Sequence, residues 1–367
     1  MRVLYLEPFD SGSHAEFTRT LVGGLDAEVT ALTLPGRHWK WRMRGAVPWW
    51  VETEPEALAA RYDVIFASAY VPLAELRGLA PALATTPAVL YFHENQLTYP
   101  VREAHAHVRD HHYAFTQIVS ALAADRCVFN SAHNRDGFLT EAERFVRRMP
   151  DFVPAASVAG LRERCEVLGL PLRLPDLPDE ALAPRPVDPD RGPLIVWPHR
   201  WEYDKHPELF FEALQALNDR DLPFRVAVCG QRFSTVPDVF DAMRPVLGDR
   251  VVAWGRVEPR ADYEALLGEA DLVVSTADHE FFGAAMVEAA WCGAEPLVPD
   301  RLAYPEIFAE RYRYRHDDAL APMLEARVRW GLAGHSLRAD RRAELSRYRA
   351  DAMVPRYDAL LARVAGV

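Results

Sequence analysis

Short apolar runs recur along the chain, and most are followed by polar residues and then by a segment of helical composition. Runs of this kind, rich in β-branched residues, predict buried strands. We expect strands at 2–6, 28–34, 62–68, 88–92, 126–131, 194–197, 224–229, 250–254, 271–276 and 295–298. We expect helices at 15–24, 71–79, 110–124, from 132, at 284–292, after 318 and at 340–365. The alternation of strand, polar tip and helix is typical of α/β proteins with doubly wound parallel sheets.

A proline-rich stretch separates two such patterns. Residues 171–193 contain Pro171, Pro175, Pro178, Pro184, Pro186, Pro189 and Pro193. Prolines at this density interrupt regular structure and indicate an interdomain linker. We therefore predict one Rossmann-like domain at 1–170, a second at 194–340, and a final helix at 341–367 that packs back on the first. Two such domains facing each other predict a cleft that closes around a ligand by hinge motion.

Composition narrows the class of protein. Half of the 367 residues are hydrophobic and 26% are charged, which is ordinary for a globular protein. The net charge of −11 argues against a protein that coats nucleic acid with its whole surface, although a local basic patch stays possible. No apolar stretch is long enough to span a bilayer, and residues 1–6 lead into a loop without a signal-peptide pattern. The four cysteines are far apart in sequence, which favours free thiols in a reducing cytoplasm.

Residues 37–44 differ most from the rest of this acidic chain. Arg37, Lys40, Arg42 and Arg44 alternate with Trp39 and Trp41. Cations neutralise phosphates, and indole rings stack on unpaired bases or on sugars. The stretch is therefore a candidate RNA-binding element. The alternative is a surface loop whose tryptophans attach it to the core while its charges face water.

A second candidate site follows the strand expected at 194–197. Arg200 and Lys205 lie in one strand-to-helix loop. A guanidinium and an ammonium together suit a diphosphate, and they stabilise the charge that develops when a diphosphate leaves. The alternative is that both cations simply pair with Glu202 and Asp204.

The third candidate is the strand–loop–helix–strand unit at 271–298. Glu280 follows the strand, and Glu288 lies eight positions later on the expected helix. Ligands of open α/β sheets bind beyond the carboxyl ends of the strands, where a helix N-terminus suits phosphate. The two carboxylates would then bind sugar and ribose hydroxyls, unless they are merely solvated. The pair resembles the Glu-x7-Glu signature of retaining glycosyltransferases of the GT-B fold in glycosyltransferase family four.

Several longer motifs resemble one branch of that family, the tRNA-queuosine α-mannosyltransferases. They are SGSH at 11–14, LPGRHWKWR at 34–42, YFHENQL at 91–97, VFNS at 128–131, WPHRWEYDK at 197–205 and DHEFFG at 278–283. The resemblance implies transfer of mannose from GDP-mannose to the cyclopentenediol of queuosine in the anticodon loop of a tRNA for aspartate. It also implies retained anomeric configuration, no cofactor and no obligatory metal. The expected partners are a sugar nucleotide and queuosine-containing tRNA, without a membrane, and we name no protein partner.

By the same resemblance, 1–170 is the acceptor-binding domain and 194–340 the donor-binding domain. The implied catalytic residues are His93, Glu280, Arg200 and Lys205. The implied donor-binding residues are Gly12, Ser13, Arg200, Lys205, Glu280, Phe281, Phe282, Gly283 and Glu288. The implied acceptor or tRNA-binding residues are Arg37, Trp39, Lys40, Trp41, Arg42, Arg44, Glu94, Asn95 and Asn130.

Three other functions fit parts of the sequence. A family-four transferase with another sugar nucleotide and a lipid, polysaccharide or other small acceptor would need an apolar and basic membrane-facing surface, of which the first domain shows no clear sign. A sugar-nucleotide epimerase would convert the donor alone. A non-catalytic tRNA-binding protein would bind no sugar nucleotide. The residues by themselves leave the base and the sugar of the donor open.

Overall fold

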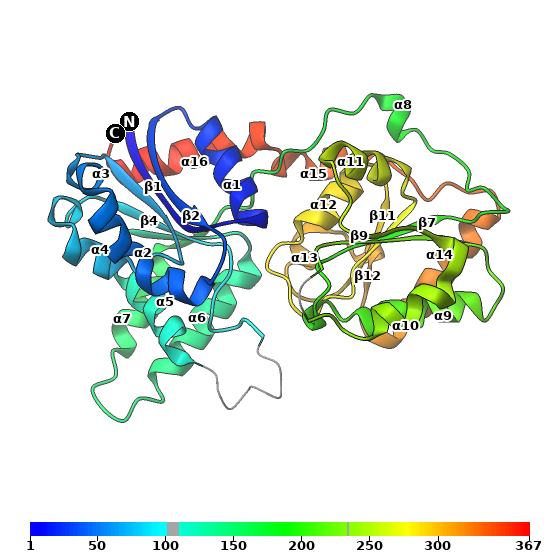
Figure 1. Ribbon diagram of the computed structural model, residues 1–367, viewed down its shortest axis with the longest axis horizontal. Helices are drawn as coiled ribbons and strands as arrows, with labels where there is room; N and C mark the ends of the chain where they lie inside the picture. The colour runs from blue at the N-terminus through cyan, green and yellow to red at the C-terminus, as the bar shows by residue number, and fades with distance from the viewer. Residues whose placement is uncertain (101–109, 233–234) are drawn as a thin grey trace. The chain divides into compact units, whose positions relative to one another are not determined.

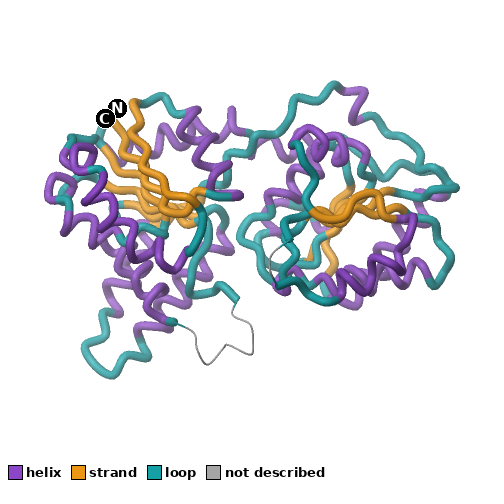
Figure 2. The backbone as a smooth tube through the Cα atoms, viewed as in Figure 1, coloured by secondary structure: helices purple, strands orange, loops and turns teal. Residues whose placement is uncertain are grey.

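The computed structural model describes residues 1–100, 110–232 and 235–367, which form two compact units (Figure 1). The first unit comprises Met1–Arg173 and Arg347–Val367, and the second comprises Leu174–Ser346. Each unit has a six-stranded sheet with helices on both faces (Figure 2). The strand pairs in both sheets are parallel. The predicted doubly wound α/β architecture is therefore confirmed for both halves of the chain.

The first unit has the strand order β2-β1-β3-β4-β5-β6. Its strands are β1 (Arg2–Asp10), β2 (Glu28–Pro35), β3 (Val64–Ser68), β4 (Ala88–Phe92), β5 (Arg126–Phe129) and β6 (Cys165–Val167). Its helices include α1 (Gly12–Gly24), α2 (Trp39–Thr53), α3 (Pro55–Ala59), α4 (Leu73–Leu79), α5 (His111–Ala123), α6 (Ala132–Val146), α7 (Ala155–Ala159) and α16 (Ala350–Ala365).

Alternate residues of these strands build two separate cores. Leu4 and Leu6 of β1 join a mixed apolar core that extends to Trp50 of α2. Tyr5 points to the opposite face, because successive strand residues alternate sides. Its ring stacks on that of Phe66 with centroids 5.5 Å apart. The helices α1 and α16 cover this aromatic face.

The second unit has the strand order β12-β11-β10-β7-β8-β9. Its strands are β7 (Leu194–Pro198), β8 (Arg225–Cys229), β9 (Val251–Gly255), β10 (Leu272–Val274), β11 (Glu295–Pro299) and β12 (Arg313–Tyr314). Its helices include α8 (Asp179–Leu182), α9 (Pro207–Asn218), α10 (Val239–Leu247), α11 (Arg260–Glu269), α12 (Ala284–Trp291), α13 (Tyr304–Ile307), α14 (Leu320–Leu332) and α15 (Arg342–Leu345). Helices α9, α10 and α14 cover one face of the sheet, and α11 and α12 cover the other (Figure 1).

The boundary between the units differs from the predicted linker at 171–193. Residues from Leu174 onward belong to the second unit, where Leu182 and Val187 are buried. The backbone carbonyl of Pro175 also accepts a hydrogen bond from Trp291 Nε1 at 2.8 Å. Prolines prevent long regular elements, but they leave the apolar residues between them able to pack. The stretch is therefore mostly an extended segment of the second unit.

The single helix expected at 340–365 is also wrong. Helix α15 ends at Leu345, and α16 begins only at Ala350. Between them the backbone bonds to Leu172, whose N–H donates to Tyr348 O at 2.7 Å and whose carbonyl accepts from Ala350 N at 2.8 Å. These bonds compete with helical ones, so the helix is broken where the chain returns to the first unit. In the described residues, no helix is long and apolar enough to cross a membrane.

We predict that Tyr357→Phe destabilises the first unit by about 1–2 kcal/mol, because a buried donor is lost. The Tyr357 hydroxyl donates to Gly169 O at 2.8 Å and lies 3.2 Å from Leu168 O, fixing α16 to the end of β6. Urea unfolding measures the change. The half-buried Tyr62 hydroxyl donates to Ala57 O at 3.0 Å, so Tyr62→Phe is the control and should cost less. Equal losses in both variants would contradict the anchoring role of Tyr357.

Candidate active site

The loop between β7 and α9 places its two cations in different environments. Lys205 ends a short 3-10 helix at Tyr203–Lys205, and only 6% of its side chain is exposed. Its ammonium donates to the carbonyl of His279 at 2.5 Å and lies 3.4 Å from Glu280 Oε2 and 3.3 Å from Asp204 Oδ2. Burial lowers the pKa of Lys205, but the charges of Glu280 and Asp204 outweigh it and hold the pKa above its usual value. The ammonium therefore stays charged.

Glu280 is held from two sides in the loop after β10. Its Oε1 accepts hydrogen bonds from the backbone N–H groups of Phe281 at 3.1 Å and Phe282 at 3.3 Å. Burial raises the pKa of Glu280, whereas the attraction of Lys205 and the bond from Phe282 lower it to about 2. The result is an ionised carboxylate in a fixed orientation, which can accept hydrogen bonds from sugar hydroxyls.

The residues after Glu280 support it mainly through their backbone. The rings of Phe281 and Phe282 are buried, so the donor contacts predicted for these residues would be made by their backbone. Their rings are apolar and buried, so the two residues contribute to the site through their backbone N–H groups, which donate to Glu280. Gly283 has φ +93, and a Cβ there would lie 2.8 Å from the ring of Tyr304. Glycine is therefore required where the loop turns into α12.

Arg200 lies at the same edge of the sheet but is more exposed, with 45% of its side chain accessible. Its guanidinium lies 3.1 Å from Glu202, so the predicted alternative pairing with local carboxylates does occur. Its positive charge also lowers the pKa of Lys205. Arg200, Lys205 and Glu280 thus gather at the carboxyl ends of β7 and β10, which are neighbours in one sheet.

His199 follows β7 directly and is buried, and it was not among the predicted site residues. Burial and the charge of Lys205 lower the pKa of His199 to about 3, so the imidazole is neutral at physiological pH. Within the described ranges its Nε2 has no hydrogen-bond partner. Its position directly after a predicted strand and next to Arg200 could have identified it from sequence as a candidate site residue.

Glu288 lies on α12 and faces α11. Its carboxylate forms a two-pronged pair with Arg260, at 3.0 Å and 3.3 Å. Only 15% of the Glu288 side chain is exposed. Arg260 was not predicted, because its partner is 28 residues away and only the packing of α11 on α12 brings them together.

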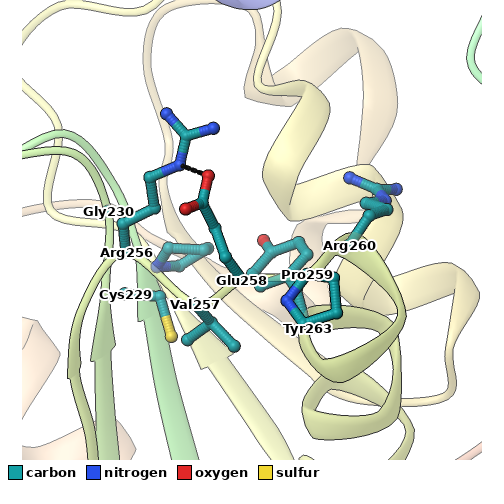
Figure 3. Close-up of a pocket in the computed structure, with 9 residues that line it drawn as sticks. Cys229, Gly230, Arg256, Val257, Glu258, Pro259, Arg260 and Tyr263 are labelled. Carbon is teal, nitrogen blue, oxygen red and sulfur yellow. Dashed lines mark ion pairs between the residues drawn. The ribbon is translucent and has the colours of Figure 1, made fainter.

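Arg260 also lines a cavity of about 660 Å³ at the carboxyl ends of β7, β8 and β9 (Figure 3). The lining residues are Pro198, Cys229, Gly230, Arg256, Val257, Glu258, Pro259, Arg260 and Tyr263. Apolar walls with a few charged groups are typical of small-ligand sites. Gly230 has φ +147, and a Cβ there would clash with the carbonyl of His199 at 1.8 Å.

In the first unit, the tips of β1, β3 and β4 converge on the buried carboxylate of Glu7. Its Oε1 accepts bonds from Phe9 N at 2.8 Å and Ser68 Oγ at 3.2 Å. Its Oε2 lies 3.1 Å from His14 Nδ1 and 3.8 Å from His93 Nε2. The two imidazole rings are 4.0 Å apart between centroids. Glu7 and His14 were not predicted as site residues, since a glutamate at the end of an apolar run gives no sign of its partners.

These contacts set the two histidines apart. Burial lowers the pKa of His14, but the charge and hydrogen bond of Glu7 outweigh it, so the pKa is raised. Burial and the positive charge of His14 both lower the pKa of His93. His93 is therefore neutral, whereas His14 holds its proton to a higher pH than an ordinary imidazole because its pKa is raised. Next to them, Gly12 and Ser13 are exposed in the first turn of α1, where free backbone N–H groups suit an anion.

Two predicted acceptor residues have structural contacts instead. Asn95 and Asn130 are buried and both bond to Asn134 at 2.9 Å. Asn130 Nδ2 also donates to the carbonyl of His93 at 2.8 Å. This network fixes the loop after β4, in which Asn130 holds the backbone of His93 directly and Asn95 holds Asn134. Both side chains are buried, and their contact with the acceptor stays a prediction. Glu94 is only half-buried and accepts bonds from Tyr70 Oη and Gln96 Nε2.

Most of the cationic stretch at 37–44 belongs to α2, which begins at Trp39, and only Arg37 and His38 precede the helix. Trp39 is half-buried, with its ring 6.3 Å from that of Tyr70 and 5.3 Å from that of Tyr113. Trp41 is 65% exposed. The Lys40 ammonium lies over the Trp39 ring. One tryptophan thus attaches the helix to the core, as the alternative required, while the other presents a free ring face beside cations.

The fold and the site together define a GT-B glycosyltransferase. Residues 179–343 match the family described as glycosyl transferases group 1. Sucrose-phosphate synthase from Thermosynechococcus elongatus has a similar fold, with a TM-score of 0.71 and 14% identity, covering all of both chains. Anabaena HepE in complex with UDP matches with a TM-score of 0.66 and 16% identity, covering 99% of this chain and 100% of that one. At such identities these structures support the fold alone.

The particular family is the tRNA-queuosine α-mannosyltransferases, to which this chain belongs. Residues 2–172 match the family described as tRNA-queuosine alpha-mannosyltransferase N-terminal. A Drosophila melanogaster tRNA-queuosine alpha-mannosyltransferase is 40% identical over 329 residues, covering 88% of this chain and 85% of that protein. The resemblance inferred from the motifs is therefore confirmed, and the chain is a hexosyltransferase.

We predict that Glu7→Gln lowers the pKa of His14, because the opposing effect of burial is then no longer outweighed. NMR titration of the imidazole signals measures it, with Glu28→Gln at the surface as control. Because the pKa of His14 is higher in the folded state than in the unfolded state, its protonation stabilises the fold. This stability is fully present at pH below the unfolded-state pKa, and it is lost as the pH rises through the folded-state pKa. This pH dependence should disappear in Glu7→Gln. An unchanged His14 titration would show that Glu7 does not set its charge.

Proposed function

We propose that this protein transfers mannose from GDP-mannose to the cyclopentenediol of queuosine in the anticodon loop of a tRNA for aspartate, with retention of configuration. The single observation that carries the proposal is the buried contact between Lys205 and Glu280, which puts a fixed cation and a fixed carboxylate side by side. Family membership supplies the sugar and the acceptor, because the 40% identical Drosophila relative is named for this activity. We expect such a protein to work in the cytoplasm, where tRNA is found.

In this proposal the cations stabilise the departing diphosphate. Negative charge grows on the leaving group as the glycosidic bond breaks, so preorganised charges lower the barrier more than they tighten ground-state binding. We assign this role to Arg200 and Lys205, and we assign no step to a metal. Glu280 accepts hydrogen bonds from mannose hydroxyls, and Glu288 accepts them from the ribose.

Retention without a placed nucleophile requires attack from the face that the diphosphate leaves. The leaving phosphate then takes the proton of the acceptor hydroxyl, so no side chain needs to be a strong base. A neutral His93 suits this scheme. It can accept a hydrogen bond from the acceptor hydroxyl, and it does not repel the positive charge that develops on the sugar as the diphosphate leaves. Glu94 is half-buried and follows His93 directly in sequence, and we assign it to the acceptor in place of the buried Asn95 and Asn130.

The test is transfer itself. The protein is incubated with queuosine tRNA and GDP-mannose, and the RNA is digested to nucleosides for mass spectrometry. We expect mannosylqueuosine from the wild type and a loss of about a thousandfold or more in Glu280→Ala, because a charged contact in the transition state is removed. Glu310→Ala, which removes a surface carboxylate paired with Arg315, should keep full activity.

Each failure has a distinct meaning. Unchanged queuosine with the wild type would reject the mannosyltransferase assignment in favour of another acceptor. Conversion of the sugar nucleotide without RNA would indicate an epimerase. Near-native transfer by a folded Glu280→Ala variant would remove Glu280 from the site.

We predict that replacing Arg37, Lys40, Arg42 and Arg44 by Ala weakens tRNA binding and flattens its salt dependence. Each phosphate contact adds roughly 0.7–0.9 to the slope of log affinity against log salt. Filter binding at several salt concentrations measures this slope. Replacing the exposed Arg144, Arg147, Arg148 and Arg162 by Ala removes the same charge from another surface of the same unit. If both variants, or neither, changed the slope, the start of α2 would not be the RNA-binding element.

A further inference from the structure

One edge of the cavity in the second unit carries a pair of opposite charges (Figure 3). Arg256 Nε lies 2.5 Å from Glu258 Oε1, and the two side chains are 65% and 62% exposed. A pair this exposed contributes little to stability. Its groups can therefore turn to a ligand at small cost. The apolar wall beside it, from Val257, Pro259 and Tyr263, offers a surface for a flat ring.

The cavity is connected to the carboxylate that we assign to the ribose. Arg260 lines the cavity and also binds both oxygens of Glu288. A nucleoside whose ribose reaches Glu288 therefore places its base among the lining residues. The charged edge then faces the hydrogen-bonding atoms of that base.

A carboxylate next to a guanidinium does not suit all bases equally. Guanine offers two adjacent donors, N1–H and the N2 amino group, and it offers O6 and N7 as acceptors to an arginine. Adenine and cytosine have a ring-nitrogen lone pair next to their amino group. Uracil has a carbonyl on each side of its N3–H. Each of these three bases would turn a lone pair towards the carboxylate, which repels it.

We infer that Glu258 and Arg256 select guanine as the base of the donor nucleotide. Glu258 accepts hydrogen bonds from N1–H and the N2 amino group, and Arg256 donates to O6 or N7. The inference rests on the proposed function, because it takes the cavity to be the site of the donor nucleotide. It assigns to two residues a choice that the sequence alone left open.

Calorimetry with GDP, IDP and UDP tests this selection. IDP differs from GDP only in lacking the N2 amino group. We expect the wild type to bind GDP about tenfold more tightly than IDP, and more tightly still than UDP, because hydrogen bonds to a charged group are lost. In Glu258→Gln the preference for GDP over IDP should fall to within about twofold. The amide N–H of Gln then faces one of the two donors of guanine, N1–H or the N2 amino group, and cannot accept a hydrogen bond from it. The affinity for UDP should rise, because the repulsion between the carboxylate and the uracil carbonyls is relieved, and binding of UDP also shows that the variant is folded.

Glu310→Gln is the matched control, because Glu310 is 67% exposed and lies 2.6 Å from Arg315. It should keep the wild-type preference. An undiminished preference for GDP over IDP in Glu258→Gln would overturn the inference. If the wild type nevertheless mannosylated queuosine tRNA, the proposed function would stand without it. If guanine selection depended on Glu258 but no transfer occurred, the inference would hold and the proposed function would fall.

Discussion

The site depends on one buried ammonium. Lys205 contacts Glu280 and Asp204 where water is largely excluded, so each charge needs the others to offset its lost hydration. Because β7 and β10 are neighbours in a parallel sheet, their following loops reach the same edge and bring these groups together. Glu280 and Lys205 are consequently fixed before any ligand arrives. Preorganised charge of this kind is what a departing diphosphate requires.

The first unit uses a different chemistry at the same edge of its sheet. Here a buried carboxylate, Glu7, meets two imidazoles rather than an ammonium. The pKa of His14 is raised by Glu7, whereas burial and then the charge of His14 lower the pKa of His93, which stays neutral. The sheet edge of the second unit that holds Lys205 and Glu280 is therefore strongly charged, whereas the tip of β4 presents a neutral imidazole. That division suits a reaction in which a hydroxyl attacks and a diphosphate leaves.

Local sequence determined the architecture and the positions of most candidate residues. Apolar runs alternating with helical segments predict parallel sheets, because each buried strand needs an apolar run and each crossover needs an amphipathic helix. Polar residues directly after a strand must then lie at its carboxyl end. For this reason Arg200, Lys205, Glu280 and His93 could be selected as candidates from sequence alone, and the motifs around them were sufficient to indicate the family.

Tertiary structure decided which of those residues are buried among other elements and which stay accessible. Asn130 reads like a site residue at a strand tip, yet side-chain bonds 4 and 37 residues away make it part of the scaffold. Glu7 and Arg260 have no local signal, because their partners come from other elements. The helix break before Ala350 likewise depends on bonds to Leu172. The hydrophobic periodicity and the composition of a segment depend only on residues that are close along the chain. The burial of a side chain, its hydrogen-bond and ion-pair partners and its charge are set by residues that meet only when the sheets are formed.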